Sequence, residues 1–171
     1  MAEYSPSRSI VDRMRGAAAL DVATYEEVEN DLNATGQAAI VVVIVAIASA
    51  IGNWGHGASG PIGGLISAIL GWLSWAGITY FIGTRFFGGT ATWGELLRTL
   101  GFAQSPGVLM VLGIIPVLGG LVKLVVGIWM LVAGIVAIRQ ALDIETGKAV
   151  LVALCGWAVY LVLGLLTSGI I

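Results

Sequence analysis

Long apolar runs separated by short polar or glycine-rich breaks make up the chain from residue 35 onward. Between Asp31 and Arg85 there is no Asp, Glu, Lys or Arg. Because a membrane-spanning helix needs about 20 mostly apolar residues, this interval has room for two spans and a turn. The pattern predicts a first span at 35–51 and a second at 62–83, joined by the glycine-rich loop GNWGHGASGP.

A third span is predicted to begin as an amphipathic helix and to break soon afterwards. Thr92 and Glu95 match the capping box, so a helix should begin near Trp93. The segment LLRTLGFAQSPG then turns apolar and reaches a proline, which removes a backbone donor and predicts a kink or short interruption. The residues of this helix break are Gln104, Ser105 and Pro106. The glutamine and serine side chains can bond the backbone groups that the break frees.

Two further apolar runs complete the predicted bundle. The short turn PVLGG precedes a fourth span at 121–138, and the polar link RQALDIETGK separates it from a fifth at 149–171. The fold class that follows is an all-α polytopic membrane protein, with a five-helix transmembrane bundle at 35–171. Composition agrees, because 58% of the residues are hydrophobic and only 11% are charged, which excludes an ordinary soluble domain.

The first 34 residues are predicted to form an acidic cytoplasmic head. Residues 1–31 hold seven acids and three arginines, a balance that does not favour nucleic-acid binding. The segment SRSIVDRMRGAAAL gathers Ile10, Val11 and Met14 on one face, which predicts a short amphipathic helix at the membrane surface. No apolar run followed by a cleavage site is present in this region, so a signal peptide is not expected.

The cations predict the orientation in the membrane. Seven of the eight Lys and Arg residues fall on the side of the predicted N-terminal head, and only Lys123 falls on the other. The positive-inside rule therefore places the N-terminus in the cytoplasm and the C-terminus outside an inner membrane. We expect four cations near one leaflet boundary to contact lipid headgroups or a partner, although they can equally serve only to fix the topology. They are Arg85, Arg98, Arg139 and Lys148.

Small residues recur at helical spacing on two of the predicted spans. One set lies on the second span at intervals of four residues, and the other lies on the fourth span at intervals of seven. Helices in lipid associate through close approach of small residues, so these faces are predicted to pack against neighbouring helices. The two sets are Gly63, Ser67 and Gly71, and Gly120, Gly127 and Gly134.

Several stretches, taken in order, resemble the Yip-one (Ypt-interacting protein) family in its prokaryotic form. They are YEEVENDLNATGQA, GTRFFGGTATWGELLRTLGFAQSPGVL, IPVLGG and IWMLVAGIVAIRQALDIETGKA. The resemblance runs from about Tyr25 to the end of the chain. It implies a five-span membrane fold of bacterial origin with no catalytic residues. Eukaryotic members of the family bind prenylated small GTPases and take part in vesicle traffic.

Candidate chemistry is sparse in this sequence. His56 has no second ligand nearby for a metal, and Cys155 has no visible base that would make it a nucleophile. We therefore expect no cofactor, no metal and no enzymatic activity. The leading hypothesis is a structural or assembly element, an accessory subunit that packs against lipids and other membrane-protein subunits or forms a homo-oligomer. The alternative is a small transporter or channel, and an intramembrane enzyme ranks last.

Overall fold

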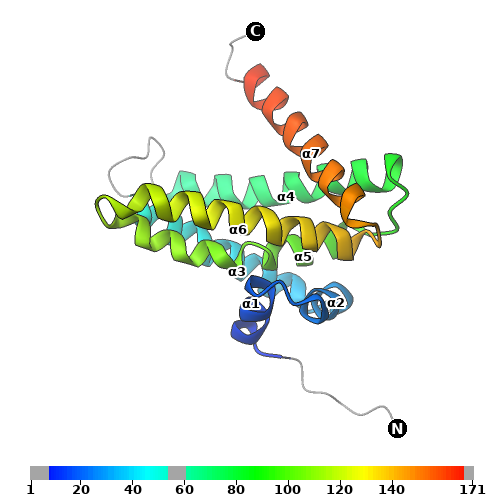
Figure 1. The fold of residues 1–171 in the computed structure, drawn as a ribbon, viewed down its shortest axis with the longest axis horizontal. Coiled ribbons are helices and arrows are strands. Elements are labelled where there is room, and N and C mark those ends of the chain that lie inside the picture. The colour runs from blue at the N-terminus through cyan, green and yellow to red at the C-terminus, as the bar shows by residue number, and fades with distance from the viewer. Residues whose placement is uncertain (1–7, 54–60, 168–171) are drawn as a thin grey trace.

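The computed structural model describes residues 8–53 and 61–167, and every regular element in these ranges is a helix. The all-α prediction is therefore confirmed for the described residues. The elements are α1 (Ile10–Ala18), α2 (Val22–Asn30), α3 (Ala34–Gly52), α4 (Pro61–Phe86), α5 (Trp93–Phe102), the 3₁₀ helix η1 (Ser105–Ile114), α6 (Leu118–Ala141) and α7 (Thr146–Thr167). The long helices α3, α4 and α6 run along the long axis of the molecule (Figure 1).

Side chains fix where the short helices begin. The predicted capping box is confirmed at α5, where the Glu95 amide donates to Thr92 Oγ1 at 3.3 Å and the Thr92 amide donates to Glu95 Oε2 at 2.7 Å. At α1 the hydroxyl of Ser9 accepts from the Asp12 amide at 3.2 Å. These bonds satisfy amides that have no partner inside the helix.

Three of the described helices, α3, α4 and α6, are long and apolar enough to cross a membrane. The bent pair α5 and η1 adds a fourth candidate if it counts as one span. The fifth predicted span corresponds to α7, which is apolar over Thr146–Val159. The five-span count thus stays a prediction, and both the end of that span at 168–171 and His56 lie outside the described residues.

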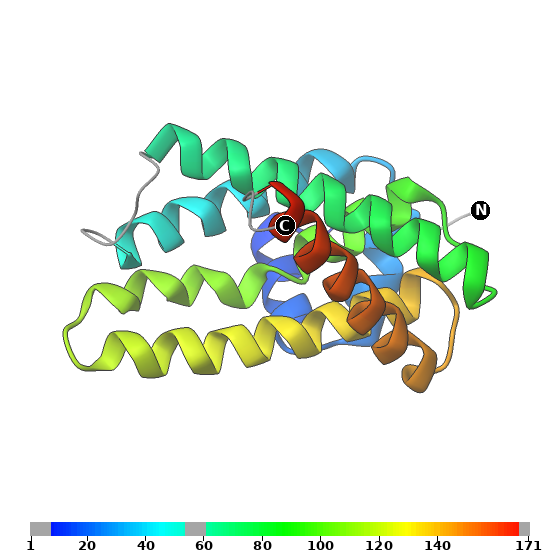
Figure 2. The ribbon, with the colours of Figure 1, turned by 90° about the horizontal axis from the view of Figure 1, so that it is seen from above.

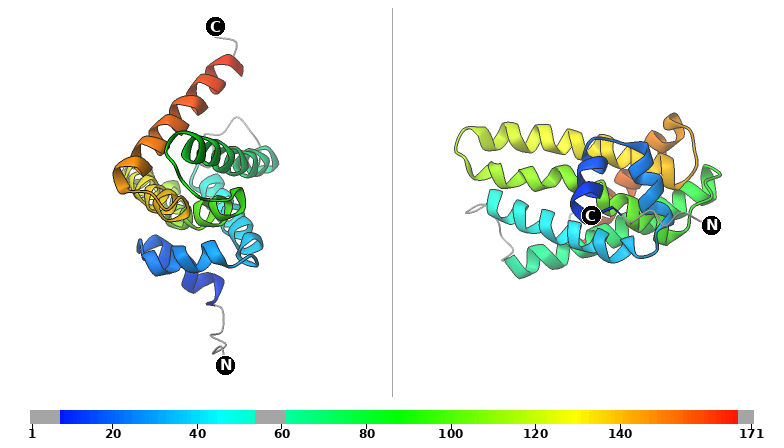
Figure 3. Two further views of the ribbon diagram at one scale, coloured as in Figure 1. Left: turned by 90° about the vertical axis from the view of Figure 1, so that its right-hand side faces the viewer. Right: turned by 90° about the horizontal axis from the view of Figure 1, so that it is seen from below.

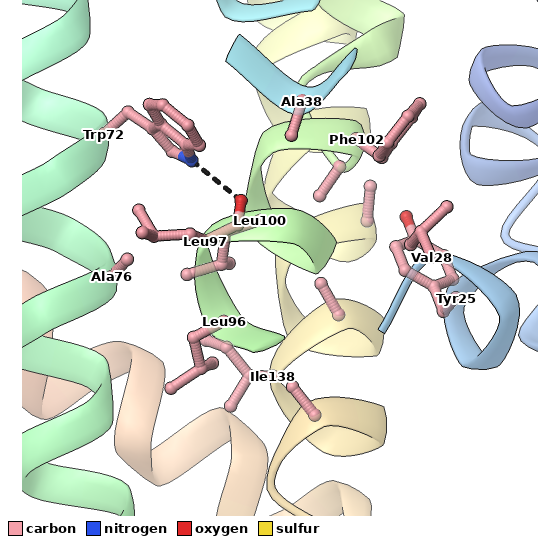
Figure 4. Close-up of a cluster of buried hydrophobic side chains, with 14 of the residues drawn as sticks. Tyr25, Val28, Ala38, Trp72, Ala76, Leu96, Leu97, Leu100, Phe102 and Ile138 are labelled. Atoms are coloured by element: carbon pink, nitrogen blue, oxygen red, sulfur yellow. Dashed lines mark hydrogen bonds between the residues drawn. The ribbon is translucent and has the colours of Figure 1, made fainter. Parts of the chain in front are cut away.

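The helix α5 lies at the centre of the molecule. Every residue from Leu96 to Phe102 is buried, with α3, α4, α6 and the head helices around it. Figure 4 shows Leu96, Leu97 and Leu100 between the tryptophan of α4 on one side and Tyr25 and Val28 of α2 on the other. The indole Nε1 of Trp72 donates to the Leu97 carbonyl at 3.0 Å.

The two ends of the chain occupy opposite flanks of the bundle. Helices α1 and α2 pack on one flank, and α7 diverges from the bundle on the other (Figures 1 and 3). From above, α7 crosses over the layer that holds α4 and α6 (Figure 2). The predicted amphipathic helix at the N-terminus is α1, and it packs against the bundle through Met14 and Ala17.

The close approach of α5 to α3 at Gly101 gives a test of this packing. A methyl group on Gly101 would lie 2.7 Å from the Cβ of Ala38 and 3.3 Å from its backbone. We expect Gly101→Ala to lower the free energy of unfolding in detergent by about 1–3 kcal/mol, the usual cost of overpacking. The matched control is Gly36→Ala, whose added methyl meets nothing within 4 Å. Equal effects of the two substitutions would contradict the α3–α5 contact.

Candidate functional site

A buried arginine joins the head to the bundle. Arg98, on α5, is 4% exposed, and its Nε donates to the carbonyls of Val28 and Glu29 at 3.0 Å each. Its Nη2 also donates to the Glu29 carbonyl. These carbonyls belong to the last turn of α2, where they lack partners inside the helix and carry the negative end of the helix dipole. Arg98 therefore caps α2 and fixes the head against α5.

A second buried arginine organises the head itself. Arg13, on α1, is 1% exposed and binds Glu27 at 2.9 Å and Asp31 at 2.7 Å. Its Nη1 donates to Gln37 Oε1 at 2.9 Å, which links α1 to the first turn of α3. The hydrogen bond from Arg13 holds the pKa of Asp31 below its usual value. The head is thus held by charged groups with several partners each, the arrangement that buried charges require.

Glu29 lies at the junction of α2, α5 and the link between α6 and α7. Its Oε2 is buried and has no hydrogen-bond partner among the described residues. The pKa of Glu29 is raised to about 7, mainly by desolvation and also by the nearby carboxylates of Glu26, Asp143 and Glu95, while Arg98 acts in the opposite direction. Glu29 is consequently the group in this junction whose charge changes near neutral pH.

The four predicted cations occupy different settings. Arg98 is enclosed by the head and does not lie at a headgroup surface, which differs from the expectation because its guanidinium finds carbonyl partners inside the protein. Arg85 and Lys148 are exposed. Arg139 is half-buried and donates to Gln140 at 2.8 Å and Thr146 at 3.4 Å. Three of the four cations are thus at least partly exposed, whereas Arg98 is buried.

The helix break lies between α5 and η1, which are bent by 40°. Ser105 is 6% exposed, and its hydroxyl donates to the Phe102 carbonyl at 2.6 Å, so it satisfies a backbone group that the break frees. Pro106 is buried beside it. Gln104 is half-buried and makes no side-chain hydrogen bond within the described residues.

The small residues face an open groove. A cavity of about 420 Å³ lies between α4, α6 and the helix break, and Gln104 lies on its wall. Four of the predicted small residues line it: Ser67, Gly71, Gly127 and Gly134. A Cβ added at Gly120, Gly127 or Gly134 would meet no atom within 4 Å, so these glycines make no close contact with another helix among the described residues. Gly63 is half-buried near the start of α4.

The close glycine contacts occur at positions that the spacing did not single out. A Cβ on Gly52 would lie 1.8 Å from the Met110 carbonyl oxygen, and one on Gly107 would lie 2.5 Å from the Val45 side chain. Both lie where α3 runs along η1. Each is a single glycine without a periodic partner, so periodicity could not reveal it.

Ligand sets for a metal are not found in the part of the chain that the structure describes. No group of three or more His, Cys, Asp and Glu side chains there could hold an ion. Cys155 is exposed on α7, and the head helices α1 and α2 lie on the opposite flank of the bundle (Figure 3).

Loss of the Arg98 cap should loosen the head. Replacing Arg98 by Met leaves the Val28 and Glu29 carbonyls without their partner. We expect a loss of about 1–3 kcal/mol in the free energy of unfolding, measured by denaturation in detergent. The control is Arg15→Met on the exposed side of α1, which should change it by less than about 0.5 kcal/mol. Equal losses would show that Arg98 does not hold the head.

The raised pKa of Glu29 predicts that the free energy of unfolding depends on pH. Its pKa is raised on folding from 4.5 to about 7, so the ionised form is disfavoured in the folded state. The contribution of Glu29 to stability should therefore be highest below pH about 4.5, fall as the pH rises to about 7, and then level off. In Glu29→Gln this fall should disappear, whereas the control Glu145→Gln should keep it. Thermal unfolding across this pH range measures both, and an unchanged fall in Glu29→Gln would refute the assignment.

Comparison with known proteins identifies the family. The model of the Yip1 domain matches residues 22–167, which include α2 to α7. No curated protein and no solved structure is similar enough to the chain to give a match. The family match agrees with the resemblance carried by the sequence motifs and with the apolar helices of the structure. The protein therefore belongs to the Yip1 domain family of helical membrane proteins.

Proposed function

We propose that this protein is a non-enzymatic structural or assembly element of a bacterial inner membrane, an accessory subunit that packs against partner membrane proteins and lipids. In this proposal α7 is the fifth span, residues 1–34 form a cytoplasmic head, and residues 35–171 form the membrane domain. The N-terminus then lies in the cytoplasm and the C-terminus outside.

The observation that carries the proposal is the open groove between α4 and α6. Gly127 and Gly134 have no atom within 4 Å of an added Cβ, so the α6 backbone is bare along this face. Small residues are the positions at which transmembrane helices approach one another closely. A glycine face that no described side chain contacts at these two positions is therefore suited to a helix of another subunit.

Polar groups in the groove support an assembly role. Gln104 and Ser67 both line it, and an amide or hydroxyl in an apolar environment gains by bonding a partner. The side chain of Gln104 has no such partner within the described residues. A partner helix that carries a polar group at this depth would satisfy it.

The three cations other than Arg98 lie at positions suited to contact with lipid around the assembly. Arg85, Arg139 and Lys148 lie near the same end of the bundle, at the ends of α4 and α6 and the start of α7. Basic side chains at a leaflet boundary attract anionic headgroups with about 1 kcal/mol each. Their positions support contact with the inner leaflet.

Filling the groove tests the proposal. We expect Gly127→Leu combined with Gly134→Leu to reduce the amount of co-purified partner subunits about tenfold, because two isobutyl groups would occupy the groove. The mass and composition of the natively extracted particle measure this effect. The control is Gly36→Leu, which adds the same side chain to another open glycine position. If both variants retain the same partners, or if the wild-type particle contains one copy and lipid alone, the proposal fails.

A further inference from the structure

A second cavity lies further along α4, in the crevice between α4 and α7. Its volume is about 680 Å³, within the range of about 300–1,000 Å³ that is usual for small-molecule sites. Its lining residues all present apolar side chains, apart from one glycine and one thiol. Those that carry the argument are Ile78, Phe81, Ile82, Phe86, Cys155 and Val159.

The walls of this crevice are apolar and partly fixed. Phe81 and Phe86 pack edge to face, with ring centroids 6.0 Å apart and an angle of 77° between the rings. Gly156 brings α7 close to α4, since a Cβ there would lie 3.4 Å from the Trp75 ring. A fully apolar space does not favour water, and it suits a hydrocarbon chain.

Two cations, one on α4 and one on α7, lie on the helix faces that also carry residues lining the cavity. Arg85 follows Phe81 by four residues and Ile82 by three, so it shares their face of α4. Lys148 precedes Cys155 by seven residues and Val159 by eleven, so it shares their face of α7. Both cations are exposed, and neither has an ion pair with another described residue.

Helix stability does not explain Lys148. It lies in the first turn of α7, where the helix dipole disfavours a positive charge. The acids nearest in sequence do not neutralise it by direct contact. Asp143 accepts a hydrogen bond from Thr90 at 3.2 Å, and Glu145 is exposed and forms no ion pair with another described residue.

We propose that the α4–α7 crevice binds one phospholipid, with an acyl chain in the apolar cavity and the phosphate at Arg85 and Lys148. The charge of the two cations complements the phosphate, and the apolar walls complement the chain. The inference rests on the proposed function only in requiring that the bundle be embedded in a membrane. The site is separate from the α4–α6 groove, and its occupancy does not depend on a partner subunit.

The test uses the purified full chain in nanodiscs of phosphatidylcholine. A trace of phosphatidylglycerol with a photoreactive diazirine on one acyl chain is added and crosslinked, and the labelled peptides are identified by mass spectrometry. The comparison probe is diacylglycerol with the same photoreactive chain, which lacks the phosphate. We expect phosphatidylglycerol to label the segments around Phe81–Phe86 and Val152–Val159 at least fivefold more strongly than diacylglycerol does.

Matched variants separate this site from general lipid contact. Cys155→Phe should reduce labelling of these segments about tenfold by filling the cavity, whereas Leu154→Phe, at an exposed position that does not line the cavity, should change it less than twofold. Arg85→Gln with Lys148→Gln should bring phosphatidylglycerol to the level of diacylglycerol, and Lys123→Gln should not. Thermal unfolding confirms that each variant is folded.

Other outcomes overturn the proposal. Labelling spread over all lipid-facing helices in proportion to their exposure would mean surface lipid only. Equal labelling by the two probes would remove the role of the cations. Equal effects of Cys155→Phe and Leu154→Phe would remove the role of the cavity. Each of these results leaves the particle mass unchanged, so it is distinguishable from a failure of the assembly proposal.

Discussion

The contact between Arg98 and the last turn of α2 connects the two parts of this molecule. One guanidinium, almost fully buried, supplies donors to two carbonyls that end a helix. Because a buried charge is costly without partners, this contact requires α2 and α5 to stay together. Because α3, α4 and α6 all pack around α5, the same contact also fixes the head relative to these three helices.

This arrangement makes the acidic head part of the folded core. Tyr25 and Val28 of α2 are fully buried, and the indole of Trp129 on α6 donates to the Ala18 carbonyl at 2.7 Å. The opposite flank is different, because α7 contacts α4 and then leaves the bundle. The molecule thus has one flank closed by its own head and another with exposed apolar helices and open crevices. Both proposed interactions, with a partner helix and with a phospholipid, use surfaces outside the closed flank.

Sequence patterns predicted the helical class, the capping box at Thr92 and Glu95, and most helix limits, because these depend on local hydrophobicity and short-range hydrogen bonds. The structure gives three helices that are long and apolar enough to cross a membrane, with the bent pair α5 and η1 as a fourth candidate, so the count of five spans remains a prediction. The role of Arg98 was not predictable. Its partners lie 69 and 70 residues away, and local charge counting treats it as one more topology signal.

The glycines also show that local sequence patterns do not reveal contacts between helices. Regular spacing drew attention to Gly120, Gly127 and Gly134, which are open within the chain, and passed over Gly52 and Gly107, which allow α3 to approach η1. Spacing along one helix shows which residues share a face, but which face meets a neighbour depends on the other helices. The 3₁₀ course of η1 was equally hidden, because a proline predicts that a helix breaks and not how the chain continues.

Amide hydrogen exchange of the full chain in lipid nanodiscs tests most directly whether the head belongs to the folded core. If Arg98 joins the head to the core, the amides of α2 from Tyr25 to Val28 should exchange as slowly as those of α5 from Leu96 to Phe102. Both sets of amides would then be exposed to solvent by the same unfolding event. Head amides that exchange at the rate of an unfolded chain while α5 stays protected would contradict this account.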